Sequence, residues 1–66
     1  MKPIPENLHD EFVAYVEMAD DPEAPDGAWQ ARIEDACQEF MKRHKISGFA
    51  NDAFHQYLHL RYPDDT

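Results

Sequence analysis

The chain has 66 residues, of which 14 are acidic and six are lysine or arginine, so its net charge is −8. This length allows one small domain (1–66), and a single cysteine excludes an internal disulfide. The charge disfavours direct binding to nucleic acid or to an anionic membrane, because both interactions depend on cations that neutralise phosphates. No apolar run approaches the ~20 residues of a membrane span, and no signal peptide is visible, so we expect a cytoplasmic protein.

The apolar spacing predicts an all-α fold, a small three-helix bundle with helices at about 7–19, 27–45 and 51–61. Residues 1–5 hold two prolines and are expected to be extended. On the first helix, apolar side chains recur on one face at Leu8, Phe12, Tyr15, Val16 and Ala19. Residues 20–27 combine two prolines, a glycine and four acids, which predicts an acidic loop.

The second and third helices have similar apolar faces. The second carries Trp29, Ile33, Ala36, Cys37 and Phe40, with Met41 and His44 on the flank. The third carries Ala50, Ala53, Phe54, Tyr57 and Leu58, while Leu60 and Tyr62 near the chain end are candidates for exposure. Asp26 and Asn51 are expected to cap these helices, and Ser47-Gly48 to stop the second one.

The acidic residues are concentrated at the start of the chain, where residues 1–27 hold eight acids and one lysine. On one regular helix, four of these acids would lie within about 60° of one another, with neighbours roughly 6 Å apart, a spacing comparable with that of DNA phosphates. Val13 and Met18 lie among them. Such a face is either a solvated surface that keeps the protein soluble or a partner-binding surface. Its candidate binding residues are Glu6, Asp10, Val13, Glu17, Met18 and Asp21.

Two constellations contain residue types that can carry chemistry. Asp52, His55 and His59 have a helical spacing that zinc accepts, but this metal candidate is weak because both an H-E-x-x-H pattern and a cysteine pair are missing. Exposed histidines are the simpler interpretation. Cys37 lies on the apolar face about 10 Å along the helix from His44, too far for a nucleophile and its base. We therefore expect no catalytic residues, no cofactor and no enzyme activity.

We interpret the chain as a small acidic protein that presents its first helix to a basic protein surface, such as a nucleic-acid-binding groove. In size, acidity and helical content it is similar to phage and plasmid proteins that inhibit restriction or CRISPR systems, a likeness of class that transfers no site. The alternative is a helical interaction or regulatory module, or a homo-oligomer, held by apolar contacts through Val13, Met18, Leu60 or Tyr62. The basic turn 42–45 also leaves a head-to-tail homodimer open; DNA binding through this turn is opposed by the net charge.

Overall fold

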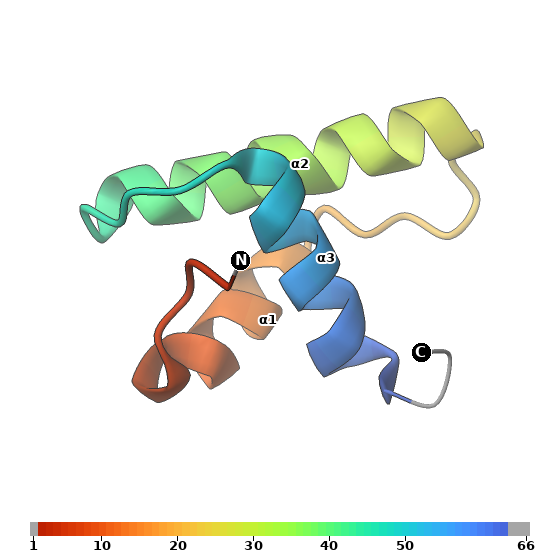
Figure 1. The fold of residues 1–66 in the computed structure, drawn as a ribbon. Coiled ribbons are helices and arrows are strands. Elements are labelled where there is room, and N and C mark those ends of the chain that lie inside the picture. Colours follow the sequence, from red (N-terminus) through yellow and green to blue (C-terminus); the bar gives the residue numbers. More distant parts are fainter. Residues whose placement is uncertain (1, 64–66) are drawn as a thin grey trace.

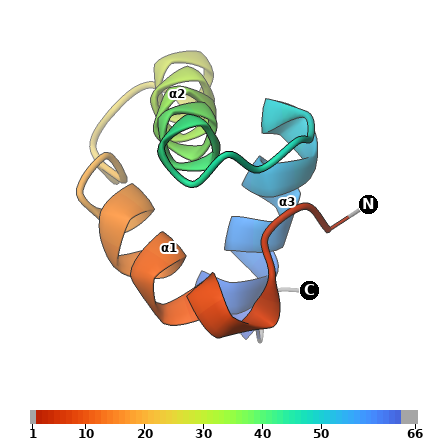
Figure 2. The same cartoon turned by 90° about the vertical axis from the view of Figure 1, so that its left-hand side faces the viewer.

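Three α-helices make up most of the computed structural model, which describes residues 2–63; Met1 and the acidic tail 64–66 lie outside the described residues. The elements are a short 3-10 helix η1 (Glu6–Leu8) followed by α1 (His9–Glu17), α2 (Asp26–Arg43) and α3 (Ala50–Arg61), with no strand in the described part of the chain. The longest helix, α2, lies across α1 and α3, which occupy the same side of it (Figures 1 and 2). The predicted small all-α bundle is confirmed.

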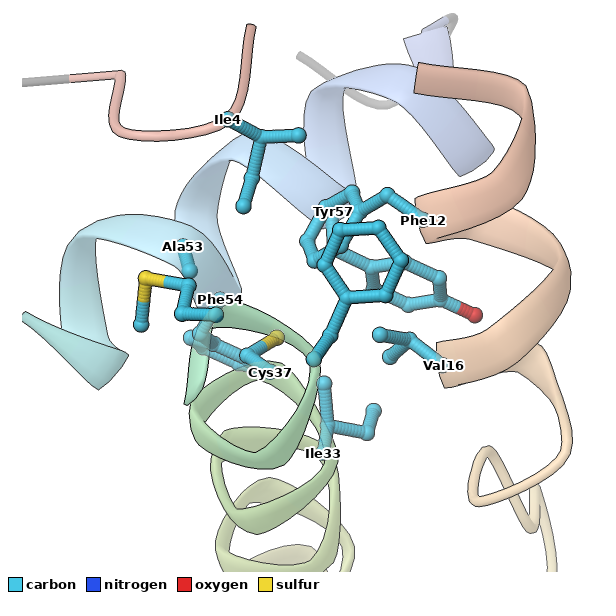
Figure 3. Close-up of a cluster of buried hydrophobic side chains, with 10 residues drawn as sticks. Ile4, Phe12, Val16, Ile33, Cys37, Ala53, Phe54 and Tyr57 are labelled. Carbon is cyan, nitrogen blue, oxygen red and sulfur yellow. The ribbon is translucent and has the colours of Figure 1, made fainter. Parts of the chain in front are cut away.

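One apolar core lies between the three helices (Figure 3). Its buried members are Ile4, Phe12, Val16, Ile33, Cys37, Phe40, Met41, Ala53, Phe54 and Tyr57. Phe12 lies at the centre, with its ring centroid 5.3 Å from that of Phe40 and 6.2 Å from that of Tyr57. The apolar faces read from the spacing therefore supply this core, because a helix brings residues three and four apart to the same side.

The segment before η1 is a structural part of the core. Ile4 is 2% exposed, and its backbone is paired with the buried side chain of Gln56: the Ile4 N–H donates to Gln56 Oε1, and Gln56 Nε2 donates to the Ile4 carbonyl, each at 2.9 Å. The segment also passes close to Gly48, where a Cβ atom would come within 2.6 Å of Pro3. Gly48 has no Cβ atom and thus allows this close approach. It lies in the segment between α2 and α3, past the end of the helix that it was expected to stop.

The helix boundaries differ from the expected ones at the caps. Pro25 and Phe49 occupy the two N-cap positions, and neither makes a side-chain cap hydrogen bond. The prediction that Asp26 and Asn51 cap α2 and α3 is wrong, since both lie inside their helices. The negative charge of Asp26, in the first turn of α2, interacts favourably with the positive end of the helix dipole. The side-chain amide of Asn51 donates a hydrogen bond to Glu34 Oε2 at 3.2 Å.

The end of α2 is closed by the backbone of residues 41–46. Ile46 N–H donates to the Met41 carbonyl at 2.8 Å, which requires a left-handed residue between them, and Lys45 takes that conformation with a φ of 55°. Glycine is the residue that adopts this conformation without a steric cost. The backbone of Lys45 is therefore strained. The helix ends at Arg43 and does not reach Lys45.

Replacing Lys45 with glycine is expected to raise the free energy of unfolding by about 0.5–1 kcal/mol, because the left-handed backbone is no longer strained. Urea denaturation followed by far-UV circular dichroism measures this change. The matched control is Lys45→Ala, which removes the same charge but keeps the strain and is expected to give no gain. Equal stabilisation by both substitutions would mean that charge, and not backbone conformation, limits this turn.

Candidate protein-binding surface

The four acids of the predicted face do not form one evenly spaced row. Asp10 and Glu17 lie within α1, seven residues apart and about 20° apart around the helix axis. Glu6 belongs to η1, which winds more tightly and rises faster per residue than an α-helix. Asp21 lies beyond the helix end, in the loop before α2. The helix expected at about 7–19 is present as η1 followed by the nine-residue α1, so the four acids do not share one regular helix.

Two of the four carboxylates already have cationic partners. Glu17 Oε1 lies 3.2 Å from Arg61 of α3, and Asp21 Oδ2 lies 3.9 Å from Arg32 of α2. Glu6 and Asp10 are exposed and form no ion pair with any residue from 2 to 63. Because exposed ion pairs contribute roughly 0–1 kcal/mol, the partnered acids can exchange their cations for those of another molecule.

The two apolar members of the face have different environments. Val13 is half-buried and packs against the core, whereas Met18 is 77% exposed just past the end of α1. Beside Met18, an open hollow of about 280 Å³ lies between α1 and α2. Its lining residues are Tyr15, Met18, Ala19, Arg32 and Ala36. Met18 is therefore the member of the predicted face that offers apolar contact area to another molecule.

Sequence reasoning missed the role of Asp20, which joins the acidic loop to two helices. Its Oδ1 atom accepts from the indole nitrogen of Trp29 at 2.7 Å, and its Oδ2 atom accepts from the hydroxyls of Tyr57 at 2.6 Å and Tyr62 at 2.7 Å. The available signal was a tryptophan and a tyrosine on apolar helix faces, with a second tyrosine just past the third helix, since the polar tips of these side chains need partners when they are buried. Tyr62 is consequently half-buried, not exposed.

The ionisation of this cluster follows from its hydrogen bonds. Burial alone would raise the pKa of Asp20, but the bonds from Tyr57, Trp29 and Tyr62, together with the charge of Arg61, hold that pKa below 3.8. Burial and the bond to Asp20 raise the pKa of Tyr57 far above its ordinary value. The pKa of Tyr62 is raised chiefly by its own bond to Asp20. At neutral pH the cluster therefore contains one carboxylate and two neutral phenols.

The other candidate residues lie apart from this region. His55 and His59 are exposed on α3, and no group of three histidine, cysteine or acidic side chains within residues 2–63 has an arrangement that could hold a metal ion. Cys37 is fully buried, and burial raises the pKa of its thiol to about 12, so the thiol is protonated and weakly reactive at neutral pH. The ring of His44 packs against Phe40, with centroids 4.3 Å apart.

Comparison with known proteins found no matching family model, no matching curated protein and no matching solved structure. Over the described residues, none of the helices combines the length and the apolar character needed to cross a bilayer. The features of the chain that bear on function are therefore those of its surface: its charges, its exposed apolar side chains and its hollows.

Proposed function

We propose that the protein acts by binding a basic protein partner through an acidic face formed by η1, α1 and the start of the following loop. This acidic face consists of Glu6, Asp10, Val13, Glu17, Met18 and Asp21. The observation that carries the proposal is the exposure of Met18 beside carboxylates. In the described part of the chain, only Met18 and Phe49 are large apolar side chains with most of their surface exposed. Methionine is enriched in protein interfaces, where its flexible thioether adapts to a partner.

The charge of the chain supports a basic partner. A net charge of −8 on 66 residues attracts a positive surface over distances longer than a contact. The unpaired carboxylates of Glu6 and Asp10 can meet lysine or arginine side chains directly, while Met18 supplies the apolar part of the interface. A nucleic-acid-binding groove is a more specific candidate for this partner, since such a groove is built to attract negative charge.

A binding role is favoured over catalysis by the size of the surface hollows. Three hollows lined by described residues enclose about 270, 280 and 300 Å³ and are open to solvent. Pockets for small-molecule substrates usually enclose roughly 300–1,000 Å³ and bury most of the ligand, so these hollows lie at or below the lower end of that range. The buried Cys37 offers no accessible thiolate. We therefore propose a non-enzymatic protein that needs no cofactor.

Reversing two charges on the acidic face is expected to abolish partner capture. The double variant Glu6→Lys/Asp10→Lys changes the two acids of the face that form no ion pair within residues 2–63, so the fold should be retained. Partner affinity should fall about tenfold or more, because favourable charge pairs become repulsive. Tagged wild-type and variant chains are used to capture proteins from a lysate, and the affinity of the protein identified is then measured at several salt concentrations.

The control for this experiment carries the same charge change elsewhere. Asp35→Lys/Glu39→Lys reverses two exposed acids one turn apart on α2 and should leave capture intact. If both double variants lose the partner equally, net charge and not the acidic face drives binding. If the α1 variant captures the same protein with unchanged affinity, the proposed face is wrong.

The exposure of Met18 and Phe49 also favours a second candidate function, self-association through apolar contacts. Binding of that kind would persist in high salt, because the hydrophobic contribution is not screened by ions. Analytical ultracentrifugation at low and high salt distinguishes the two candidates. A dimer that persists at 1 M salt, together with no partner capture, would favour the apolar module.

A further inference from the structure

We propose that a hollow between the acidic loop and the ends of α2 and α3 binds an organic cation, the lysine or arginine side chain of a protein partner. This inference depends on the proposed function only for the molecule that carries the cation. The hollow encloses about 270 Å³ and lies apart from the Met18 hollow. Its lining residues, named from here on as the cation pocket, are Asp20, Pro22, Ala24, Asp26, Trp29 and Tyr62.

The two aromatic side chains of the cation pocket are held by one carboxylate. Trp29 comes from α2 and Tyr62 follows α3, yet both donate to Asp20, at 2.7 Å each. Trp29 is also packed edge-on against Phe54, with ring centroids 5.7 Å apart. The rings are therefore fixed before any ligand arrives, so a ligand does not have to order them.

The chemistry of the lining is complementary to a positively charged organic group. Aromatic faces attract cations through their quadrupole, and this attraction increases when carboxylates stand nearby. Asp20 lies within the hydrogen-bonded cluster, and Asp26 lines the same pocket with an exposed side chain. Pro22 and Ala24 add apolar surface that suits the methylene groups of a lysine or arginine stem.

No cation of the described part of the chain lines this pocket. The guanidinium of Arg61 lies 5.4 Å from the centroid of the Tyr62 ring and pairs with Glu17 at 3.2 Å. Arg61 is not among the lining residues, so it does not occupy the space that Trp29 and Tyr62 border. Arg61 acts on the charge of Asp20 from outside the pocket. Asp26 forms no ion pair within residues 2–63, so its carboxylate is available to a cation from another molecule.

The cation pocket is large enough for one ammonium or guanidinium group. Its volume of about 270 Å³ is below the usual range for nucleotide- or drug-sized ligands. An ammonium or guanidinium group fits such a space together with the last part of its alkyl stem. We therefore assign the pocket to one side chain of a larger partner and not to a free metabolite.

The only tryptophan of the chain lines this pocket and serves as the reporter. The full ¹⁵N-labelled chain is titrated with Nα-acetyl-lysine methylamide and with Nα-acetyl-arginine methylamide, and the indole N–H signal of Trp29 is followed by NMR. We expect saturable shifts with a Kd on the order of 10 mM. The neutral analogue Nα-acetyl-norleucine methylamide should give no saturable shift. Equal shifts by the neutral and charged probes, or no saturation by either cation up to about 100 mM, would overturn the proposal.

A pair of charge-matched variants separates the pocket from general charge effects. Asp26→Asn removes a carboxylate that lines the pocket and is expected to weaken probe binding about threefold. Glu39→Gln removes one charge near the other end of α2 and should leave the probe affinity unchanged. Circular dichroism checks that both variants stay folded. Equal weakening by both variants would show that the probes respond to net charge and would overturn the site.

The assignment of a partner side chain has its own test. A partner captured by the wild-type chain should bind Asp26→Asn about threefold more weakly than Glu39→Gln. If the small probes bind but this partner does not distinguish the two variants, its side chain does not occupy the pocket. If the probes do not bind, the proposal of the acidic face is not affected, because that face is tested separately by the Glu6/Asp10 charge reversal.

Discussion

Replacement of Asp20 with alanine is expected to lower the free energy of unfolding by about 3 kcal/mol. The change removes one acceptor that serves Trp29, Tyr57 and Tyr62, and it leaves the hydroxyl of fully buried Tyr57 without a partner. Hydrogen bonds to a charged group contribute roughly 1.5–3 kcal/mol, and an unsatisfied buried group costs about 1–3 kcal/mol. A domain of this size usually has a free energy of unfolding of only about 3–10 kcal/mol, so the folded state of the variant should be marginally stable.

A double-variant cycle tests the physical reason for this loss. Tyr57→Phe removes the hydroxyl that Asp20→Ala would leave unsatisfied, so the double variant should be more stable than the sum of the two single changes predicts. Urea denaturation, followed by both circular dichroism and Trp29 fluorescence, gives the free energies. The neighbouring control Asp21→Ala should cost less than about 1 kcal/mol, because its ion pair with Arg32 is long and its hydrogen bond from the Glu23 N–H is exposed. Strict additivity in the cycle would contradict a shared hydrogen-bond cluster.

The same cluster sets an acid dependence of stability. Because the pKa of Asp20 is held below 3.8, the folded state binds its proton less tightly than the unfolded state. The stabilisation is complete well above pH 3.8 and is lost as the pH falls below that value and through the folded-state pKa. The unfolding free energy of the wild-type chain should therefore fall more steeply than that of Asp20→Asn below about pH 4. Parallel curves would show that Asp20 does not contribute through its charge.

Replacement of Gln56 with leucine is expected to cost about 2–3 kcal/mol. The leucine side chain is apolar and of similar size, but it leaves the N–H of buried Ile4 without a partner and its carbonyl with only the longer contact to His9 Nε2, at 3.3 Å. The N-terminal segment should then separate from α3, which amide hydrogen exchange at Ile4 would detect as a loss of protection. The control Gln38→Leu makes the same change at an exposed position of α2 and should stay within about 0.5 kcal/mol.

The variant Gln56→Glu tests the hydrogen bonds between residue 56 and Ile4 in a second way. The introduced carboxylate can accept from the Ile4 N–H, but it cannot donate to the Ile4 carbonyl until it is protonated. Its folded-state pKa should therefore rise above the usual value of about 4.3, and stability relative to wild type should increase as the pH falls from about 7 to 5. His9 Nε2 lies 3.1 Å from Gln56 Nε2, so its ring borders the same contact. A variant whose relative stability decreases over that range would contradict the paired contact.

The sequence by itself determined the fold class and most of the core. Phe12, Ile33 and Tyr57 are buried where the apolar spacing places them, because helix periodicity is a local property that repeats every few residues. The concentration of acids before residue 28 was also evident from the sequence, whereas only the structure separated exposed Met18 from half-buried Val13. Residues 20–27 contain the loop, although α2 begins at Asp26.

Only the tertiary structure decided which polar groups meet. Asp20 pairs with tyrosines 37 and 42 residues later, and Gln56 with a backbone 52 residues earlier. Arg61 likewise reaches Glu17 from another helix. Such contacts have no periodic signature, since they depend on how finished helices pack and on the requirement that buried polar groups find partners. The cation pocket follows from the same packing, because its two rings belong to separate segments that Asp20 brings together.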